Sequence, residues 1–179
     1  MQSSTFWSFG YRLGLIFLFD IVWFVAVWGR ETYLPLTILF VVLLYAANYK
    51  TLWPKRLGLL ILIAAGLALE TLMVSLGVLQ FTNANILPEW LFWLWLGFGA
   101  MAFSAMDWLA GRYALAWIFG LVFGPITYLA GVRFEAAEIT SSFTLLVVGY
   151  GVMWGVLMHL LSYLLQRNLP HQVSEEETL

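Results

Sequence analysis

Long apolar segments follow one another along this chain, and only short polar breaks separate them. A transmembrane helix needs about 20 predominantly apolar residues, a length that these segments reach or approach. Transmembrane strands would alternate apolar and polar side chains, which these segments do not. The sequence therefore predicts an all-α integral membrane protein, a bundle of six transmembrane helices. The segments cover residues 7–28, 33–49, 57–79, 89–110, 113–132 and 142–165.

The composition excludes several classes of protein. Hydrophobic residues make up 63% of the chain and charged residues 10%, whereas a soluble domain is about 25% charged. The chain has no cysteine, which removes disulfides, thiolate nucleophiles and cysteine-ligated metals. Its net charge of -2 leaves no basic surplus for a phosphate backbone, so we expect no nucleic-acid partner. Nucleotide-binding and zinc-protease motifs are missing too, so we expect no cofactor and leave enzymatic activity open.

The basic residues predict the orientation in the membrane. The chain divides into one transmembrane domain, residues 1–167, and a polar, acidic tail, residues 168–179. Cytoplasmic loops are enriched in Lys and Arg. Six of the eight basic residues fall on the side of the termini, and two, Arg30 and Arg133, fall on the opposite side. We therefore expect both termini and the tail in the cytoplasm, which agrees with an even number of spans.

A few polar side chains fall inside the predicted spans, where charge is costly, and they are candidate functional residues. Asp20 and Glu70 lie about midway along the first and third spans, and His159 lies in the last span. A carboxyl group at this depth can donate a hydrogen bond between helices, or it can serve a proton relay, a cation site or a ligand anchor. His159 shares a helix face with Tyr163 and is either a hydrogen-bonded interior residue or a general base. A lone histidine cannot form a multi-histidine site, so we expect no metal.

Charged residues near the ends of the spans have plainer interpretations. Asp107 lies near the cytoplasmic end of the fourth span, and Arg112 follows five residues later, so we expect an interfacial ion pair between them. On the opposite side, Arg133, Glu135 and Glu138 follow the fifth span. They form a solvated loop, or they form a polar cap that holds an anionic headgroup.

The fifth span contains Gly124-Pro125 at its middle. Proline removes a backbone donor and clashes with the preceding turn, so we expect a kink or break there. The freed carbonyl groups need partners, which Thr127 and Tyr128 could supply. The break is either purely structural, or it lines a cavity near the middle of the membrane.

Glycine and tryptophan indicate how the helices pack. Gly10, Gly120 and Gly151 each precede a second glycine by four residues, a spacing that lets two helix backbones approach closely. Most tryptophans fall near predicted helix ends, as in an interfacial aromatic belt. Trp23, Trp95 and Trp154 fall deeper, and we interpret them as packing residues rather than ligand contacts.

Residues 87–139 carry the most recognisable motifs. They contain Pro88-Glu89-Trp90-Leu91-Phe92-Trp93-Leu94-Trp95, then Phe103-Ser104 and Trp108-Leu109, then Gly124-Pro125-Ile126-Thr127-Tyr128-Leu129-Ala130-Gly131-Val132-Arg133. The chain resembles a family of small bacterial inner-membrane proteins known only as a domain of unknown function, in which serine usually stands at the position of Thr127. The resemblance implies a multi-pass protein of the bacterial inner membrane and singles out Tyr128 and Arg133.

The resemblance also suggests a function. Members of that family are often encoded near cyclopropane-synthase-like methyltransferases and flavin amine-oxidase-like proteins, which implies work on membrane lipids or fatty acyl chains. The protein would then handle lipids or help to modify them, with membrane lipid and lipid-modifying proteins as partners. We expect an apolar cleft whose polar end is built from Arg133, Tyr128, Thr127 and nearby acids.

Two alternatives belong to other classes. In size and topology the chain is similar to the substrate-binding subunits of energy-coupling-factor vitamin transporters, in which case Trp90, Trp93, Glu135 and Glu138 would bind a small amphipathic ligand. The protein could instead be a structural or assembly partner without a ligand. Convergence of the intramembrane polar residues on one cavity would favour a ligand, and scattering of these residues would favour the structural role.

Overall fold

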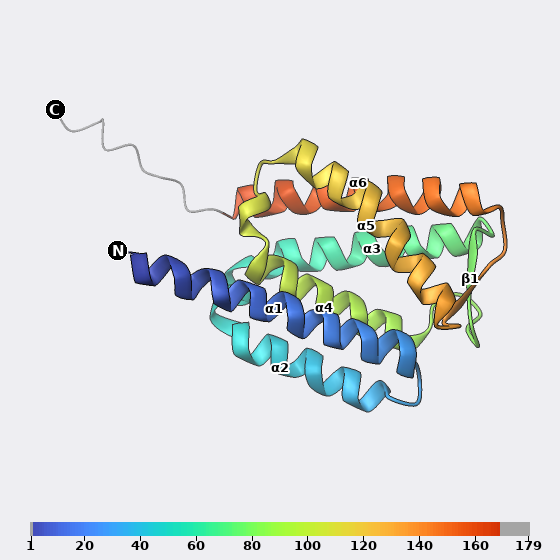
Figure 1. Cartoon of the computed structure of the whole chain (residues 1–179), viewed down its shortest axis with the longest axis horizontal. Coiled ribbons are helices and arrows are strands. Elements are labelled where there is room, and N and C mark those ends of the chain that lie inside the picture. The colour runs from blue at the N-terminus through green and yellow to red at the C-terminus, as the bar shows by residue number, and fades with distance from the viewer. Residues whose placement is uncertain (1, 169–179) are drawn as a thin grey trace.

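A computed structural model describes residues 2–168, with side chains described from Phe9 onward. The described residues are mostly helical (Figure 1). The α-helices are α1 (Gln2–Gly29), α2 (Leu34–Leu52), α3 (Arg56–Ser75), α4 (Glu89–Ala105), α5 (Tyr113–Arg133) and α6 (Phe143–Arg167). The shorter elements are the 3₁₀ turns η1 (Trp53–Lys55) and η2 (Asp107–Leu109) and the strands β1 (Leu79–Phe81) and β2 (Ala137–Ile139). Apart from Asn168, the predicted tail lies outside the described residues.

Four helical stretches of the described chain are long and apolar enough to cross a membrane. They are Phe9–Gly29, Leu34–Ser75, Tyr113–Arg133 and Phe143–Arg167. The second stretch is 42 residues long and contains α2, η1 and α3, and α4 has only 17 residues. The predicted all-α membrane class is therefore confirmed in its general form. Six separate crossings and cytoplasmic termini remain predictions.

Helix α4 is the centre of the bundle. It packs against α1, α2 and α3, and 12 of its 17 residues are buried. Helix α5 packs mainly against α6. In Figure 1, α1 begins and α6 ends at the same end of the molecule, and the strands lie at the opposite end.

The close contact between α5 and α6 depends on glycine. The backbone of Gly120 lies directly against the backbone of Trp154 and Gly155, with no room for a Cβ atom. The ring of Trp117 occupies the space where Gly155 would carry a Cβ atom. The predicted close approach is confirmed at Gly120 and Gly155, whereas nothing lies within 4 Å of the Cβ position at Gly10 or Gly14. Because lipid chains are as apolar as the helices, such packing replaces the hydrophobic effect as the force between helices.

The sequence prediction was wrong about the end of the third helix. Residues up to Leu79 were expected to be helical, but α3 ends at Ser75 and Leu79 begins β1. Gly77 has a φ of +68°, and the amides of Gly77 and Val78 bond back to the carbonyls of Val74 and Met73. This Schellman arrangement satisfies the last carbonyls of the helix and turns the chain out of it.

The small sheet was not predicted at all. Strands β1 and β2 pair antiparallel, with Leu79 opposite Ile139 and Phe81 opposite Ala137. The pairing joins the segment after α3 to the segment after α5, and it lies over one end of the bundle (Figure 1). The fourth predicted span was also too long, because α4 ends at Ala105 and the chain continues into η2.

Candidate functional site

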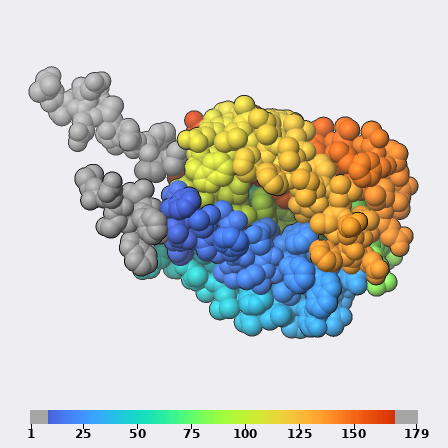
Figure 2. Space-filling view, in the orientation of Figure 1, coloured from blue at the N-terminus to red at the C-terminus, as the bar shows by residue number. Residues whose placement is uncertain are grey.

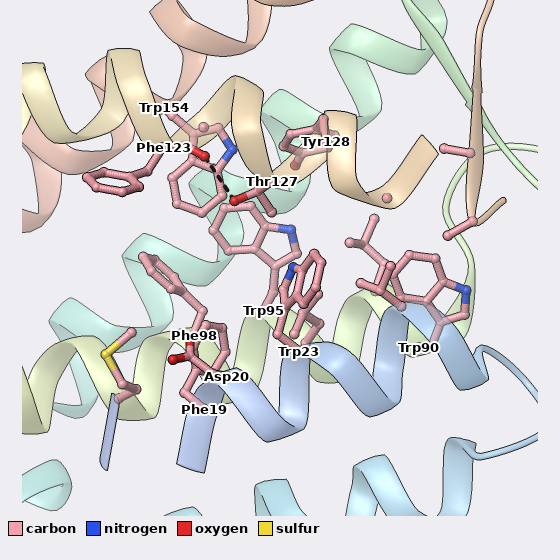
Figure 3. A pocket seen from close by; sticks show the side chains of 18 of the residues that line it. Phe19, Asp20, Trp23, Trp90, Trp95, Phe98, Phe123, Thr127, Tyr128 and Trp154 are labelled. Carbon is pink, nitrogen blue, oxygen red and sulfur yellow. Dashed lines mark hydrogen bonds between the residues drawn. The ribbon is translucent and has the colours of Figure 1, made fainter. Parts of the chain in front are cut away.

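The described residues form a pocket of about 380 Å³ between α1, α4, α5 and α6. Small-molecule sites typically have volumes of about 300–1,000 Å³. The pocket walls are largely aromatic (Figure 3), with contributions from Phe19, Trp23, Trp90, Trp95, Phe98 and Trp154. The rings of Trp95 and Trp154 stack with centroids 5.3 Å apart, and Phe98 meets Trp154 edge-on at 5.2 Å. Walls of this kind suit an apolar ligand.

The pocket opens sideways between α1 and α5. Figure 2 shows a hollow between these helices, with part of α4 visible at its floor. Phe123 of α5 lines the pocket and is also 56% exposed. Large apolar side chains are exposed on both helices, including Phe17 on α1 and Ile126 on α5. In a protein that crosses the bilayer, apolar helix surfaces of this kind face the acyl chains of the lipids.

Four of the predicted site residues meet at this pocket. Asp20 of α1 and Gly124, Thr127 and Tyr128 of α5 all line it. Asp20 is exposed toward the hollow, whereas Tyr128 is buried. The Thr127 hydroxyl donates to the carbonyl of Phe123 at 2.9 Å, which leaves its oxygen able to accept a further hydrogen bond. The pocket thus combines apolar walls with a small number of polar groups.

Two indole groups add unused donors. The Nε1–H groups of Trp90 and Trp154 are buried, and neither has a hydrogen-bond partner among the described residues. Both tryptophans line the pocket. A buried donor without a partner costs about 1–3 kcal/mol, so each of these indole groups carries a cost in the folded protein.

The predicted break at Gly124-Pro125 does not interrupt the helix. Helix α5 continues from Tyr113 to Arg133 with Pro125 inside it. Pro125 is buried, and Gly124 lies so close to the Trp154 side chain that a Cβ atom would come within 2.6 Å of it. Packing against α6 therefore holds the helix together across the missing donor, and Gly124 lets the Trp154 ring reach the pocket.

Glu70 is not in the pocket. Its side chain is fully buried on α3, and the Tyr150 hydroxyl donates to its Oε2 atom over a long 3.5 Å. The Oε1 atom has no partner within the described chain. Tyr150 stacks on the pocket residue Tyr128 with ring centroids 3.7 Å apart. Glu70 thus lies one aromatic layer behind the pocket wall, and Asp20 and Glu70 do not share a site.

Asp107 has a different partner from the predicted one. Its Oδ2 atom accepts from Arg12 Nη2 at 2.8 Å, not from Arg112. The turn η2 separates α4 from α5, so Arg112 becomes the residue that precedes α5. Helix α1 packs on α4 and brings Arg12 to the carboxylate instead.

His159 and Arg133 are exposed and lie outside the pocket. The His159 ring stacks on Tyr113 at 4.7 Å, while Tyr163 carries the guanidinium of Arg167 over its ring. Within residues 2–168, no group of three His, Asp or Glu side chains is arranged to hold a metal ion. The roles predicted for His159 and Arg133 remain predictions.

The residues of the vitamin-uptake hypothesis are divided between places. Trp90 lines the aromatic pocket, but Trp93 does not. Glu135 and Glu138 line a separate, polar surface hollow together with Arg30. The Glu135 carbonyl accepts hydrogen bonds from Arg30 and from Thr82, which ties three loops together at this end. Glu135 joins this network through its backbone carbonyl, and neither acid lines the aromatic pocket.

Sequence reasoning did not assign the aromatic walls to a site. Trp23, Trp95 and Trp154 line the pocket, although packing alone was expected of them. The signal that could have identified them is their depth, which is too great for an interfacial belt. The ion pair of Arg12 had no signal in the sequence, because its partner lies 95 residues away.

Comparison with known proteins gives a family but no function. A search of curated proteins and a search of solved structures each find no match. One family model, described as a protein of unknown function (DUF2878), matches residues 13–160. The match covers α1 from Leu13 through most of α6, and so includes every wall of the pocket. The chain therefore belongs to the DUF2878 family of proteins of unknown function.

Proposed function

We propose that this protein binds a membrane lipid by taking an acyl chain into the aromatic pocket between α1 and α5. The observation that carries the proposal is a pocket of about 380 Å³ with aromatic walls and a sideways opening. A water-soluble ligand would need a path from the aqueous phase. A lipid chain already lies beside this opening.

The length of the pocket suits one chain. Along α1 the lining extends from Ile16 to Val27, which is about 17 Å at a rise of 1.5 Å per residue. The hydrocarbon core is about 30 Å thick, so the chains of one leaflet span about 15 Å. A single chain could therefore lie along the pocket over most of its length.

The energetic basis of such binding differs from that in water. A chain that moves from the bilayer into the pocket leaves no water behind, so the hydrophobic effect contributes little. Selectivity would come from packing against Phe98 and Trp154 and from the few polar groups of the lining, including the Thr127 hydroxyl. The titratable side chains among the described lining residues are Asp20 and Tyr128, and the proposal is for binding rather than for a reaction.

Photocrosslinking in membranes tests the proposal. A phospholipid with a diazirine on its acyl chain is incorporated into vesicles with the full-length protein, and crosslinked peptides are identified by mass spectrometry. We expect adducts on pocket residues such as Phe98 and Trp154. Thr127→Phe, which fills the pocket, should reduce these adducts strongly.

The matched control is Ile126→Phe, because Ile126 is the neighbouring residue and is 54% exposed on the outer surface of α5. It adds the same ring without entering the pocket. The proposal fails if adducts form only on outward-facing residues, or if both variants crosslink like the unchanged protein. Stabilisation by a water-soluble vitamin and not by lipid would instead favour the uptake function.

A further inference from the structure

The pocket reaches a charged cluster at the end of the molecule where α1 begins. Arg12 stands on the α1 face that lines the pocket, since Ile16, Phe19 and Trp23 follow it at helical spacings of four, three and four residues. Met106 also lines the pocket, and Asp107 is the next residue. The ion pair between Arg12 and Asp107 therefore stands at one end of the pocket.

A second cation joins this ion pair. Lys55 of η1 interacts electrostatically with both Asp107 and Arg12, and its Nζ atom donates to the carbonyl of Phe103 at 2.9 Å. Arg12, Lys55 and Asp107 together carry a net charge of +1. The ammonium group can donate three hydrogen bonds and the guanidinium five, so the bonds to Phe103 and Asp107 occupy only a minority of these donors.

The cluster is accessible and incompletely satisfied. The side chains of Arg12 and Asp107 are 37% and 36% exposed. The Asp107 Oδ1 atom and the Ser104 hydroxyl are nevertheless buried and have no partner within residues 2–168. The accessible part of the cluster therefore offers cationic donors beside a partly exposed carboxylate. This pattern suits a phosphodiester whose headgroup also carries a donor, such as an ammonium or a hydroxyl group.

The depth of the cluster is that of lipid headgroups. Large aromatic side chains are exposed at the same end of the bundle, namely Tyr11 of α1, Tyr49 of α2 and Trp53 of η1. Exposed aromatic rings of this kind mark the membrane interface. The Arg56 guanidinium lies over the Trp53 ring, 4.9 Å from its centroid. The cluster thus lies where the headgroup of a lipid would lie, and the pocket lies where an acyl chain of the same lipid would lie.

From this juxtaposition we infer that Arg12 and Lys55 bind the phosphate of a glycerophospholipid whose acyl chain occupies the pocket. The inference rests on the proposed function and adds the class of lipid. It places the polar end of the site at Arg12, and not at Arg133 as the sequence suggested. Asp107 keeps the two cations in place and accepts from the headgroup.

Competition in detergent micelles tests the headgroup. The full-length protein in micelles of a maltoside detergent, which carries no phosphate, is crosslinked with the diazirine phospholipid, and unlabelled competitors are titrated. We expect dioleoylphosphatidylethanolamine to compete at least about 10-fold better than dioleoylglycerol, which has the same chains and no phosphate. Lys55→Gln should remove most of this preference, and Arg56→Gln, the matched control on the neighbouring exposed cation, should retain it.

Replacement of Arg12 alone would leave the Asp107 carboxylate without its cation, so the test at this position uses a double variant. The double variant Arg12→Gln with Asp107→Asn removes both charges of the pair, and its thermal stability in detergent shows whether it folds. We expect it to fold and to lose the preference for the phospholipid.

The outcomes separate the two proposals. Crosslinking in the pocket with equal competition by both lipids would overturn the headgroup site and leave acyl-chain binding intact. A lack of pocket crosslinks would overturn both. Competition by soluble glycerol 3-phosphate as strong as that by the phospholipid would show that the cluster binds a free phosphate ester, and would overturn the lipid assignment.

Discussion

The contact between Glu70 and Tyr150 allows a quantitative test of whether the most buried carboxyl group among the described residues stabilises the fold. Glu70 is completely buried, so any structural role must come from a hydrogen bond between helices. The Tyr150 hydroxyl lies 3.5 Å from Oε2. Hydrogen bonds between oxygen atoms normally have lengths of about 2.7–2.8 Å. The perturbation is a double-mutant cycle with Glu70→Met and Tyr150→Phe, which remove the two polar ends and keep the shapes.

The expected coupling energy is small. Hydrogen bonds between helices in a membrane protein average about 0.6 kcal/mol in such cycles, with a maximum of about 1.7 kcal/mol. At 3.5 Å this bond should contribute no more than the average. Glu70→Met alone should be neutral or stabilising, because the buried Oε1 atom has no partner within the described chain and its removal relieves a desolvation cost.

The assay is reversible unfolding by sodium dodecyl sulfate in mixed micelles, followed by tryptophan fluorescence. A reference cycle, Tyr11→Phe with Asn48→Ala, breaks a bond of 2.8 Å between α1 and α2 and should give the larger coupling. A coupling above about 1.7 kcal/mol for Glu70 and Tyr150 would refute the reasoning. Destabilisation by Glu70→Met of several kcal/mol would refute it as well.

Three further predictions concern packing, charge and orientation. Gly120→Val should destabilise the protein by about 1–3 kcal/mol in the same assay, because the valine side chain would collide with the α6 backbone. The control Gly10→Val should change the stability very little, because nothing lies within 4 Å of the Cβ position there. Arg12→Gln should cost about 0.2–1 kcal/mol, as expected for a half-exposed ion pair, and an equal loss with Arg112→Gln would contradict the assigned partner of the carboxylate. The chain has no cysteine, so Glu31→Cys gives a single thiol. We expect this thiol to react with an impermeant maleimide added from the periplasmic side. If it reacts only after the membrane is broken, the predicted orientation is wrong.

The sequence was most informative where length and polarity decide the structure. Apolar runs of about 20 residues located the helices to within a few residues at most ends. The pairing of β1 with β2 was out of reach, because strands of three residues show no periodicity and their partners lie about 60 residues apart. The early end of α3 had a local signal in Gly77, whose left-handed conformation stops the helix.

The site was harder to predict because the rotation of each helix leaves little trace in a membrane protein. In water the apolar face of a helix points inward and reveals its orientation. In lipid both faces are apolar: Tyr128 of α5 is buried, while Phe123 and Ile126 of the same helix are largely exposed. Asp20 and Glu70 were predicted at equal depth, but only their helix rotations decide that one faces the pocket and the other lies behind its wall.

This separation of the two carboxyl groups bears on the orientation of a bound lipid. Asp20 follows Arg12 by eight residues, about 12 Å along α1, and it lines the pocket. In its ionised form, this carboxyl group repels a second negative charge, most strongly where water is scarce. For a phospholipid bound as we propose, the phosphate would therefore be disfavoured halfway along the pocket and favoured at its end, beside Arg12 and Lys55. One acid within the pocket and two cations at its end would then favour the same direction of binding, with the headgroup toward the start of α1 and the chain toward the β1–β2 sheet.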